Sequence, residues 1–335
     1  MTTFLTPSLA DPTYWRGKTV VVTGGSGFIG SHVVERLLPL CARVIVPTRA
    51  EGTPRHLRAV AADVQLIHGD MRDAAVAKRA CDGSDAVLML AAIVGGIEYN
   101  MAHHGSVFRD NIGVYLSTLE AARNAGTGRV LVTSSACVYP RFCQLPTPES
   151  EGTVGGPEPT NAGYGWAKRM EEFVAAAYSS EFGMSIAVAR PYNAYGPRDN
   201  FDPSSSHVIP ALIRKAFDRD LTELEVWGSG AQSRSFLYVS DFADGLIRIC
   251  ERAIDAEPTN VGADEETTIG ETALQIVRLS QRDMKVRFNT QRPEGQPRRH
   301  CDVTRLHELY DFRARVSLQD GLAATVAYYR EEFAP

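Results

Sequence analysis

Short aliphatic and β-branched runs alternate with longer stretches of helical spacing through the first half of the chain. The apolar runs cover residues 19–23, 43–46, 64–67, 86–90, 129–133 and 185–189. Strands that are continuously apolar are typical of a parallel sheet covered by helices on both faces. The pattern therefore predicts an α/β fold with a doubly wound parallel sheet.

Apolar residues at three- and four-residue spacing predict two long helices, at 107–124 and 162–182. After Pro191 the chain becomes rich in Pro, Gly, Ser and Asn, and then shows a helix near 208–218 and a strand near 224–227. Residues 236–252 indicate a strand end and a helix, and 260–262 another strand end. A chain of 335 residues exceeds the usual size of a single core.

We therefore expect a first domain of residues 1–190 plus about 236–262, and a smaller α/β lobe of 191–235 plus 263–335.

Composition excludes several classes of protein. Hydrophobic content of 44% is ordinary, and no apolar run reaches the roughly 20 residues that span a bilayer. The first residues lack the features of a secretory signal, so we expect a cytoplasmic protein. A net charge of −5 argues against nucleic acid or a membrane as the main partner. Six scattered cysteines without metal spacing indicate no metal site.

A glycine-rich turn links the first strand to the first helix. The sequence Gly24-Gly-Ser-Gly27-Phe28-Ile29-Gly30 stands where a Rossmann dinucleotide site requires it. Gly24 permits the tight turn, Gly27 lets the backbone approach the pyrophosphate, and Gly30 lets the helix pack on the sheet. The helix start at Phe28 and Ile29 offers free N–H groups to phosphate.

The second strand ends in Thr48-Arg49 rather than in the acid that holds the ribose of NAD. Arg49 has the planar fork that binds a 2′-phosphate, which favours NADP; alternatively it is a solvated loop residue. Asp70 and Met71 follow the third strand, where either an adenine contact or a plain strand end is expected.

Tyr164 and Lys168 are one helical turn apart, and Ser135 follows the preceding strand. A neighbouring ammonium stabilises a phenolate, so Lys168 should lower the pKa of Tyr164 for proton transfer. The Ser135 hydroxyl would hold a substrate carbonyl beside the nicotinamide.

Together these motifs resemble the extended short-chain dehydrogenase/reductase (NAD-dependent epimerase/dehydratase) superfamily over nearly the whole chain. The resemblance implies Tyr164 as acid/base, Lys168 as its modulator and ribose ligand, and Ser135 as carbonyl binder. It also implies cofactor contacts at other strand ends, from Leu90, Ala91, Ala92, Pro191 and Asn193.

Several stretches resemble the GDP-L-fucose synthases in order along the chain: 91–97, 135–140, 199–201, 206–212, and 295–299 with 302–306. This resemblance implies a GDP-linked 4-keto sugar as substrate and a homodimer formed through the two long helices. Those enzymes usually carry an arginine in the glycine turn, whereas this chain has Gly25-Ser26-Gly27.

Cys137 and His207 are the candidates for epimerisation. Cys137 is either a buried apolar cysteine or a base beside Ser135 that removes a proton next to a keto group. His207, at the start of a lobe helix, is either a capping residue or the group that returns a proton from the opposite face.

Arg234 and Asn193 would hold the substrate diphosphate, and Arg298 either assists or lies at the surface. The predicted substrate contacts are Val94, Gly95, Ser135, Asn193, His207, Val208, Trp227, Arg234 and Arg298.

The resulting hypothesis is 3,5-epimerisation by Cys137 and His207, followed by NADPH reduction at carbon 4 with Tyr164 as acid. One alternative is a nucleotide-sugar epimerase without net reduction, resembling GDP-mannose 3,5-epimerase or a 4-epimerase that uses bound NAD. A second is a dinucleotide sensor without catalysis, against which Ser135, Tyr164 and Lys168 argue.

Overall fold

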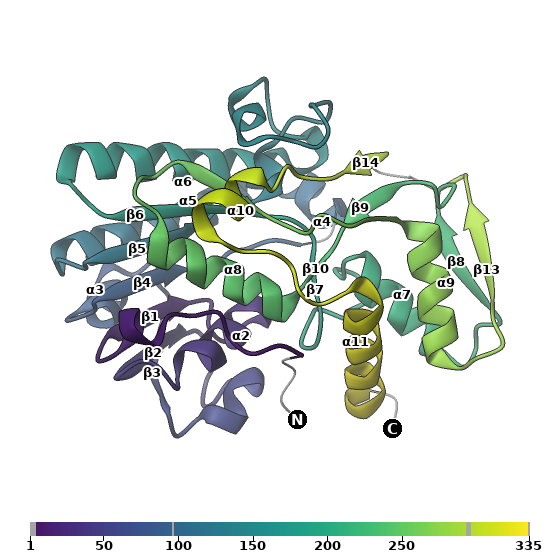
Figure 1. Cartoon of the computed structure of the whole chain (residues 1–335), viewed down its shortest axis with the longest axis horizontal. Helices are drawn as coiled ribbons and strands as arrows, with labels where there is room; N and C mark the ends of the chain where they lie inside the picture. The colour runs from purple at the N-terminus through teal and green to yellow at the C-terminus, as the bar shows by residue number, and fades with distance from the viewer. Residues whose placement is uncertain (1–4, 96, 293–295, 334–335) are drawn as a thin grey trace.

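A computed structural model describes residues 5–95, 97–292 and 296–333. Its centre is a seven-stranded parallel sheet in the order β11-β6-β5-β4-β1-β2-β3 (Figure 1). The strands are β1 (Thr19–Thr23), β2 (Arg43–Thr48), β3 (Val64–His68), β4 (Ala86–Met89), β5 (Arg129–Thr133), β6 (Ile186–Pro191) and β11 (Pro258–Val261). The doubly wound α/β fold predicted from the apolar runs is confirmed.

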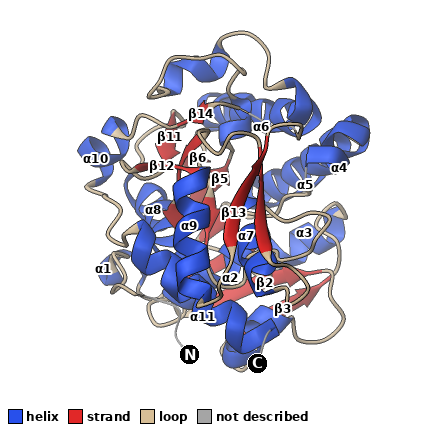
Figure 2. Ribbon diagram, turned by 90° about the vertical axis from the view of Figure 1, so that its right-hand side faces the viewer, coloured by secondary structure: helices blue, strands red, loops and turns tan. Residues whose placement is uncertain are grey.

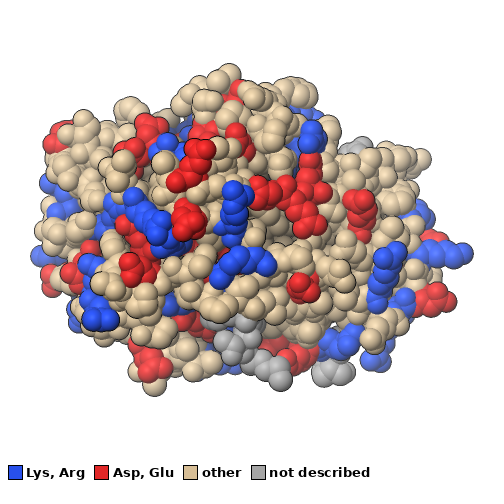
Figure 3. All heavy atoms as spheres, in the orientation of Figure 1, with Lys and Arg blue, Asp and Glu red and all other residues tan. Residues whose placement is uncertain are grey.

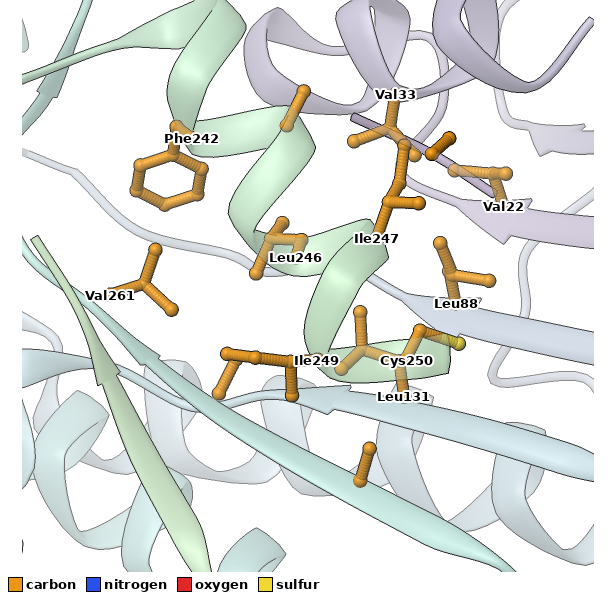
Figure 4. Close-up of a cluster of buried hydrophobic side chains, with 14 of the residues drawn as sticks. Val22, Val33, Leu88, Leu131, Phe242, Leu246, Ile247, Ile249, Cys250 and Val261 are labelled. Carbon is orange, nitrogen blue, oxygen red and sulfur yellow. The ribbon is translucent and has the colours of Figure 1, made fainter. Parts of the chain in front are cut away.

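The strands are apolar throughout because helices cover both faces of the sheet. Val20 and Val22 pack with α2 (Phe28–Leu37) and α8 (Val239–Arg252), whereas Val21 packs with the opposite layer. That layer comprises α3 (Ala74–Cys81), α5 (His104–Asn124) and α6 (Ala162–Phe182). Figure 4 shows side chains of α8 directed at β1, β4 and β5.

The second lobe has its own apolar core between three helices and a parallel strand pair. The helices are α7 (Val208–Phe217), α9 (Ile269–Ser280) and α11 (Leu318–Phe333), and the strands are β8 (Glu223–Trp227) and β13 (Lys285–Asn289). Ile213, Leu224, Ile276 and Leu322 are buried at its centre. In Figure 2 the molecule is turned by 90°, so that this lobe faces the viewer.

Two small sheets lie where the lobes meet. β12 (Glu266–Thr268), β9 (Ser233–Ser235) and β14 (Arg298–Arg299) form one, and β10 (Leu237–Tyr238) pairs with β7 (Ala194–Tyr195) in the other. Three further helices are α1 (Pro12–Trp15), α4 (Ile97–Ala102) and α10 (Thr304–Tyr310). Short 3₁₀ helices cover Arg55–Val60, Ala136–Val138, Glu149–Thr153 and Pro159–Asn161.

The chain crosses between the two cores more than once. β11 pairs with β6, and α8 packs on the same sheet, so residues 239–261 return to the first core. Leu306, Tyr310 and Phe312 also lie in that core, although they belong to the segment assigned above to the second domain. The division into two sequence-defined domains stays a prediction.

The segment before β1 is tied to α8. Trp15 is fully buried, and its indole Nε1 donates to Glu251 over 2.6 Å. Ser8 Oγ donates to Asp244, a buried carboxylate that also pairs with Arg36 of α2 at 3.1 Å. These contacts anchor residues 8–15 to the first core.

Charges of both signs are interspersed on the face shown in Figure 3. Within the part of the chain that the structure describes, no helix is long and apolar enough to cross a membrane.

Candidate active site

The glycine turn at the carboxyl end of β1 fits a dinucleotide pyrophosphate. Gly24 has φ +69°, a conformation that side chains disfavour, and a Cβ there would lie 2.8 Å from the Ala91 nitrogen. A Cβ at Gly30 would collide with the Gly24 carbonyl oxygen. Gly27 is the N-cap of α2 and provides no side-chain cap, so the first N–H groups of the helix are available to phosphate.

The expected adenosine contacts lie at the ends of β2 and β3. Thr48 is buried and its Oγ1 accepts a hydrogen bond from the Ala50 nitrogen at 3.1 Å. Arg49 is exposed. Asp70 is held by Arg72, with an Nη2–Oδ2 distance of 2.7 Å, and this hydrogen bond lowers the pKa of Asp70.

The remaining cofactor candidates line the same edge of the sheet. The Ala91 nitrogen donates to Thr23 Oγ1 at 3.2 Å, which fixes the chain as it leaves β4. Leu90 is half-buried, and Ala92 and Val94 are exposed. Met71 is buried, and Pro191 and Asn193 are half-buried at the end of β6. Gly96 and Gly295, in two of the stretches that carried the resemblance, lie outside the described residues.

Tyr164 and Lys168 lie together on α6, as their spacing predicts. The Lys168 Nζ is 5.6 Å from the centre of the Tyr164 ring and donates to the Thr133 carbonyl oxygen at 2.9 Å. The Ser135 side chain acts on Tyr164 in the direction that lowers the pKa of the phenol. Burial raises the pKa of Tyr164 to about 12, although Lys168 opposes this. This result differs from the lowered pKa expected from the sequence.

A buried acid one turn further along α6 adds to this effect of burial on the pKa of Tyr164. The Glu171 Oε2 accepts from Lys168 Nζ at 2.8 Å, and the two side chains are only 4% and 3% exposed. Burial raises the pKa of Glu171 to about 7. Burial also acts to lower the pKa of Lys168, but Glu171, Tyr164 and Glu172 together outweigh it, and the pKa is raised. Glu171 therefore offsets the charge that should act on Tyr164.

A second acid supports the strand end that carries Ser135. Glu172 pairs with Arg190 through two contacts of 2.7 Å and accepts a hydrogen bond from the Ser134 hydroxyl. Ser134 thus turns toward the protein interior. Ser135 instead caps the following 3₁₀ turn, its Oγ accepting from the Cys137 nitrogen at 3.1 Å.

Cys137 is half-buried, and two nitrogen donors face its sulfur. Asn161 Nδ2 lies 2.9 Å from the Cys137 Sγ, and Arg299 Nη2 lies 3.6 Å from it. Such donors stabilise a thiolate, which is the basic and nucleophilic form of cysteine. The surroundings of Cys137 are therefore polar, unlike those of an inert core cysteine.

The alternation of side chains along β14 explains why Arg299 faces Cys137. β14 pairs with β9 in parallel, so Arg299 is in register with Arg234 and Arg298 with Ser233. Successive side chains point to opposite faces of a sheet. Arg298 pairs with Glu266 on one face at 2.6 Å, while Arg234 and Arg299 share the other.

His207 is the N-cap residue of α7, and its side chain makes no capping hydrogen bond. His207 retains exposed surface, but the neighbouring protein removes part of the water around its imidazole. This desolvation is the larger cause of its lowered pKa, and the charge of Arg299 is the smaller one. Arg299 thus acts on both Cys137 and His207, the two epimerisation candidates.

The other predicted substrate contacts come from several separate elements. Asn193 donates to the Ser235 carbonyl oxygen at 2.9 Å, so it is tied to β9. Trp227 is 44% exposed at the end of β8, where Arg292 stacks on its ring at 5.3 Å. Val208 is half-buried at the start of α7. The Gly95 nitrogen donates to Asn100 Oδ1 at 3.1 Å.

The sequence interpretation did not identify Asn161, Glu171 and Arg299. Glu171 is three residues after Lys168 and seven after Tyr164, a spacing that places all three on one helical face. Arg299 is revealed only by the register of β14. Within the described residues, no group of three or more potential metal ligands occurs.

Comparison with known proteins agrees with this geometry. Residues 20–262 match the model of the NAD dependent epimerase/dehydratase family. A dTDP-4-dehydro-6-deoxy-D-allose reductase from Streptomyces bikiniensis is 33% identical, over 94% of this chain and 97% of the relative. A GDP-L-fucose synthase from Sinorhizobium fredii is 33% identical, over 92% and 94%.

A solved dTDP-glucose 4,6-dehydratase from Streptomyces venezuelae, with NAD bound, superimposes with a TM-score of 0.82 at 30% identity. The superposition covers 94% of this chain and 97% of that structure. The resemblance to this superfamily and to the GDP-L-fucose synthases, inferred from the motifs, is confirmed.

Proposed function

Because the chain belongs to the NAD dependent epimerase/dehydratase family, and is thus an enzyme acting on a nucleotide sugar, we propose that it epimerises a 4-keto sugar nucleotide at carbons 3 and 5 and then reduces carbon 4. The observation that carries the proposal is the polar cradle of Cys137, formed by Asn161 and Arg299 beside the tyrosine, lysine and serine set.

In the epimerisation, Cys137 acts as the base. Its thiolate, stabilised by Arg299, takes the proton from a carbon next to the 4-keto group. The Ser135 hydroxyl and the Tyr164 phenol donate to the keto oxygen and stabilise the enolate. His207 returns a proton on the other face; its lowered pKa makes the protonated imidazole a stronger acid.

In the reduction, Tyr164 donates a proton to the oxygen at carbon 4. The nicotinamide cofactor, when bound, supplies the hydride. Lys168 stabilises the resulting phenolate and offers its remaining N–H to the ribose, because two of its donors are already used by Thr133 and Glu171. The glycine turn and the start of α2 would hold the pyrophosphate.

NADP is the proposed cofactor. β2 ends at Thr48 and is followed by Arg49 instead of an acid, and the exposed Arg49 guanidinium matches a 2′-phosphate. The substrate diphosphate would lie against Arg234, with Asn193 adjacent, because Arg234 and Arg299 share one face of the small sheet. We propose GDP as the nucleotide; dTDP is the alternative named in the other group of relatives.

An epimerase without net reduction is the second candidate. It is favoured by the glycine turn, where Ser26 stands in place of the arginine expected of an NADP-dependent relative. Such an enzyme would retain the Cys137 and His207 chemistry but release no oxidised cofactor.

The test is incubation of the purified chain with GDP- and dTDP-linked 4-keto-6-deoxy sugars in D₂O, with NADPH or NADH. We expect NADPH oxidation together with deuterium at carbons 3 and 5. Cys137→Ser should abolish deuterium incorporation, and Tyr164→Phe should slow hydride transfer by about 10²- to 10⁴-fold. Deuterium incorporation without cofactor oxidation would favour the second candidate, and unchanged incorporation in Cys137→Ser would refute the role of the cysteine.

We also propose a homodimer formed through α5 and α6. These helices pack together, and their outer faces expose Phe108, Leu116 and Phe173, the last of them 67% exposed. Light scattering should show a dimer, and Phe173→Glu should yield monomers.

A further inference from the structure

The buried carboxylate of Glu171 is bound to the lysine of the catalytic set. The Lys168–Glu171 pair is almost completely withdrawn from solvent, with 2.8 Å between Nζ and Oε2. A buried ion pair is retained at some cost in desolvation, so its position beside the reacting phenol invites a functional explanation.

The geometry allows Glu171 to act on Tyr164 through Lys168. Residues 164, 168 and 171 share one face of α6, and Lys168 Nζ is 5.6 Å from the Tyr164 ring centre. The Tyr115 hydroxyl of α5 donates to the Glu171 carbonyl oxygen at 2.7 Å and fixes this turn of the helix. Glu171 is therefore held in place by α5 and by Lys168 of its own helix.

Apart from Lys168, the described groups that act on the Tyr164 phenol carry no positive charge. Ser135 and Cys137 face Tyr164 from the 3₁₀ turn after β5, and the nearby Glu172 is engaged by Arg190. The cation that acts most strongly on Tyr164 is that of Lys168. With Glu171 ionised, the Lys168 pair has no net charge.

We propose that Glu171 is a positioning residue that offsets part of the charge of Lys168 in the resting site, so that it acts together with burial to keep the proton on Tyr164 and commits the phenol to proton donation. The second part of this inference rests on the proposed reduction. There the hydride from NADPH adds to carbon 4, the Tyr164 proton goes to the carbonyl oxygen, and water restores the proton of the phenolate.

The same arrangement would disfavour an enzyme that starts by oxidising an alcohol, because that reaction needs the phenolate as base. Burial holds the pKa of Tyr164 at about 12, in agreement with a protonated resting state.

The charge effect is measured on full-length protein labelled with [ζ-¹³C]tyrosine, titrated by NMR in the presence and absence of NADPH. Tyr164→Phe identifies the resonance among the 12 tyrosines. In Glu171→Gln, which preserves shape and an acceptor for Lys168, the Tyr164 resonance should titrate about one to three pH units lower. The basic limb of the pH–rate profile for 4-keto reduction should move by the same amount.

Two variants separate charge from structure. Glu171→Asp restores the charge and should restore the wild-type titration. Tyr115→Phe disturbs the same helical turn without a change of charge and should leave the titration in place. Circular dichroism verifies that each variant is folded.

An unchanged or raised titration point of Tyr164 in folded Glu171→Gln would overturn the inference, even if the 4-keto assay succeeds. A lowered point supports the counter-charge even if that assay fails, because the titration needs no substrate. A lowered point with an unmoved pH–rate profile would overturn the commitment to proton donation.

Discussion

Arg299 offers the sharpest test of the epimerisation chemistry. Its Nη2 lies 3.6 Å from the Cys137 sulfur, and its charge contributes to the lowered pKa of His207. Replacing it by glutamine keeps a polar side chain but removes the cation. We expect less of the reactive thiolate at Cys137 and an imidazole at His207 that protonates at higher pH.

The magnitude follows from the contact. Two unit charges about 4 Å apart interact by about 4 kcal/mol near a protein surface. The side chains of Arg299 and Cys137 are half-buried, so solvent screening reduces this interaction energy. A hydrogen bond to a charged group contributes about 1.5–3 kcal/mol, which corresponds to a change of about 10- to 150-fold.

The assay is alkylation of Cys137 by iodoacetamide at pH 7, with modification at that residue followed by peptide mass spectrometry. We expect Arg299→Gln to slow alkylation by at least about tenfold. The matched control is Arg298→Gln, because Arg298 is the adjacent residue but pairs with Glu266 on the opposite face. Equal rates in wild type and Arg299→Gln, or equal losses in both variants, would refute the assignment of Arg299 to the thiolate.

Three further predictions concern the fold around the site. Asp199 is 7% exposed, and burial raises its pKa to about 7. The folded state therefore binds the Asp199 proton more tightly than the unfolded state does, and the free energy of unfolding falls as pH rises from about 4 to 7. In urea unfolding between pH 5 and 8, the free energy of unfolding of Asp199→Asn should fall by roughly 2–3 kcal/mol less than that of the wild type. Gly30→Ala places a methyl group against the preceding turn and should abolish NADPH binding in a fluorescence titration, whereas Gly105→Ala, with open space around it, should bind normally. Trp15→Phe leaves the half-buried Glu251 carboxylate without its indole donor, and calorimetry should show a loss of about 1–3 kcal/mol; an unchanged midpoint would mean that the segment before β1 adds no stability.

Local patterns were sufficient to predict most of the sheet and its helices. The predicted 19–23, 129–133 and 162–182 coincide with β1, β5 and α6 because buried strands and an amphipathic helix each have a distinctive periodicity. α4 and the 3₁₀ turns were not predicted, since short elements lack a full period. The placement of Leu306 and Phe312 in the first core depends on contacts between distant segments, which no local pattern records.

The candidate site shows the same limit. Tyr164 and Lys168 were predictable because they are neighbours on one helix, and their proximity follows from helical geometry. Arg299 approaches Cys137 across 162 residues of sequence, and only strand pairing brings them together. Glu171 was within reach of the helical pattern, but its burial, which gives it an effect on Tyr164, depends on the packing of α5 against α6.

The chemistry of the candidate active site depends on the register of the two-residue strand β14. Its position is set by contacts outside the site: Ser233 N donates to the Pro297 oxygen at 2.9 Å, and Thr147 N donates to the His300 oxygen at 2.9 Å. A slip of one residue would exchange the faces of Arg298 and Arg299. Arg298 would then face Cys137 and Arg299 would face Glu266, each attached at a shifted backbone position. The loop that carries Thr147 therefore fixes which arginine faces Cys137. Substitutions in that loop should alter catalysis although the loop contacts no reacting group.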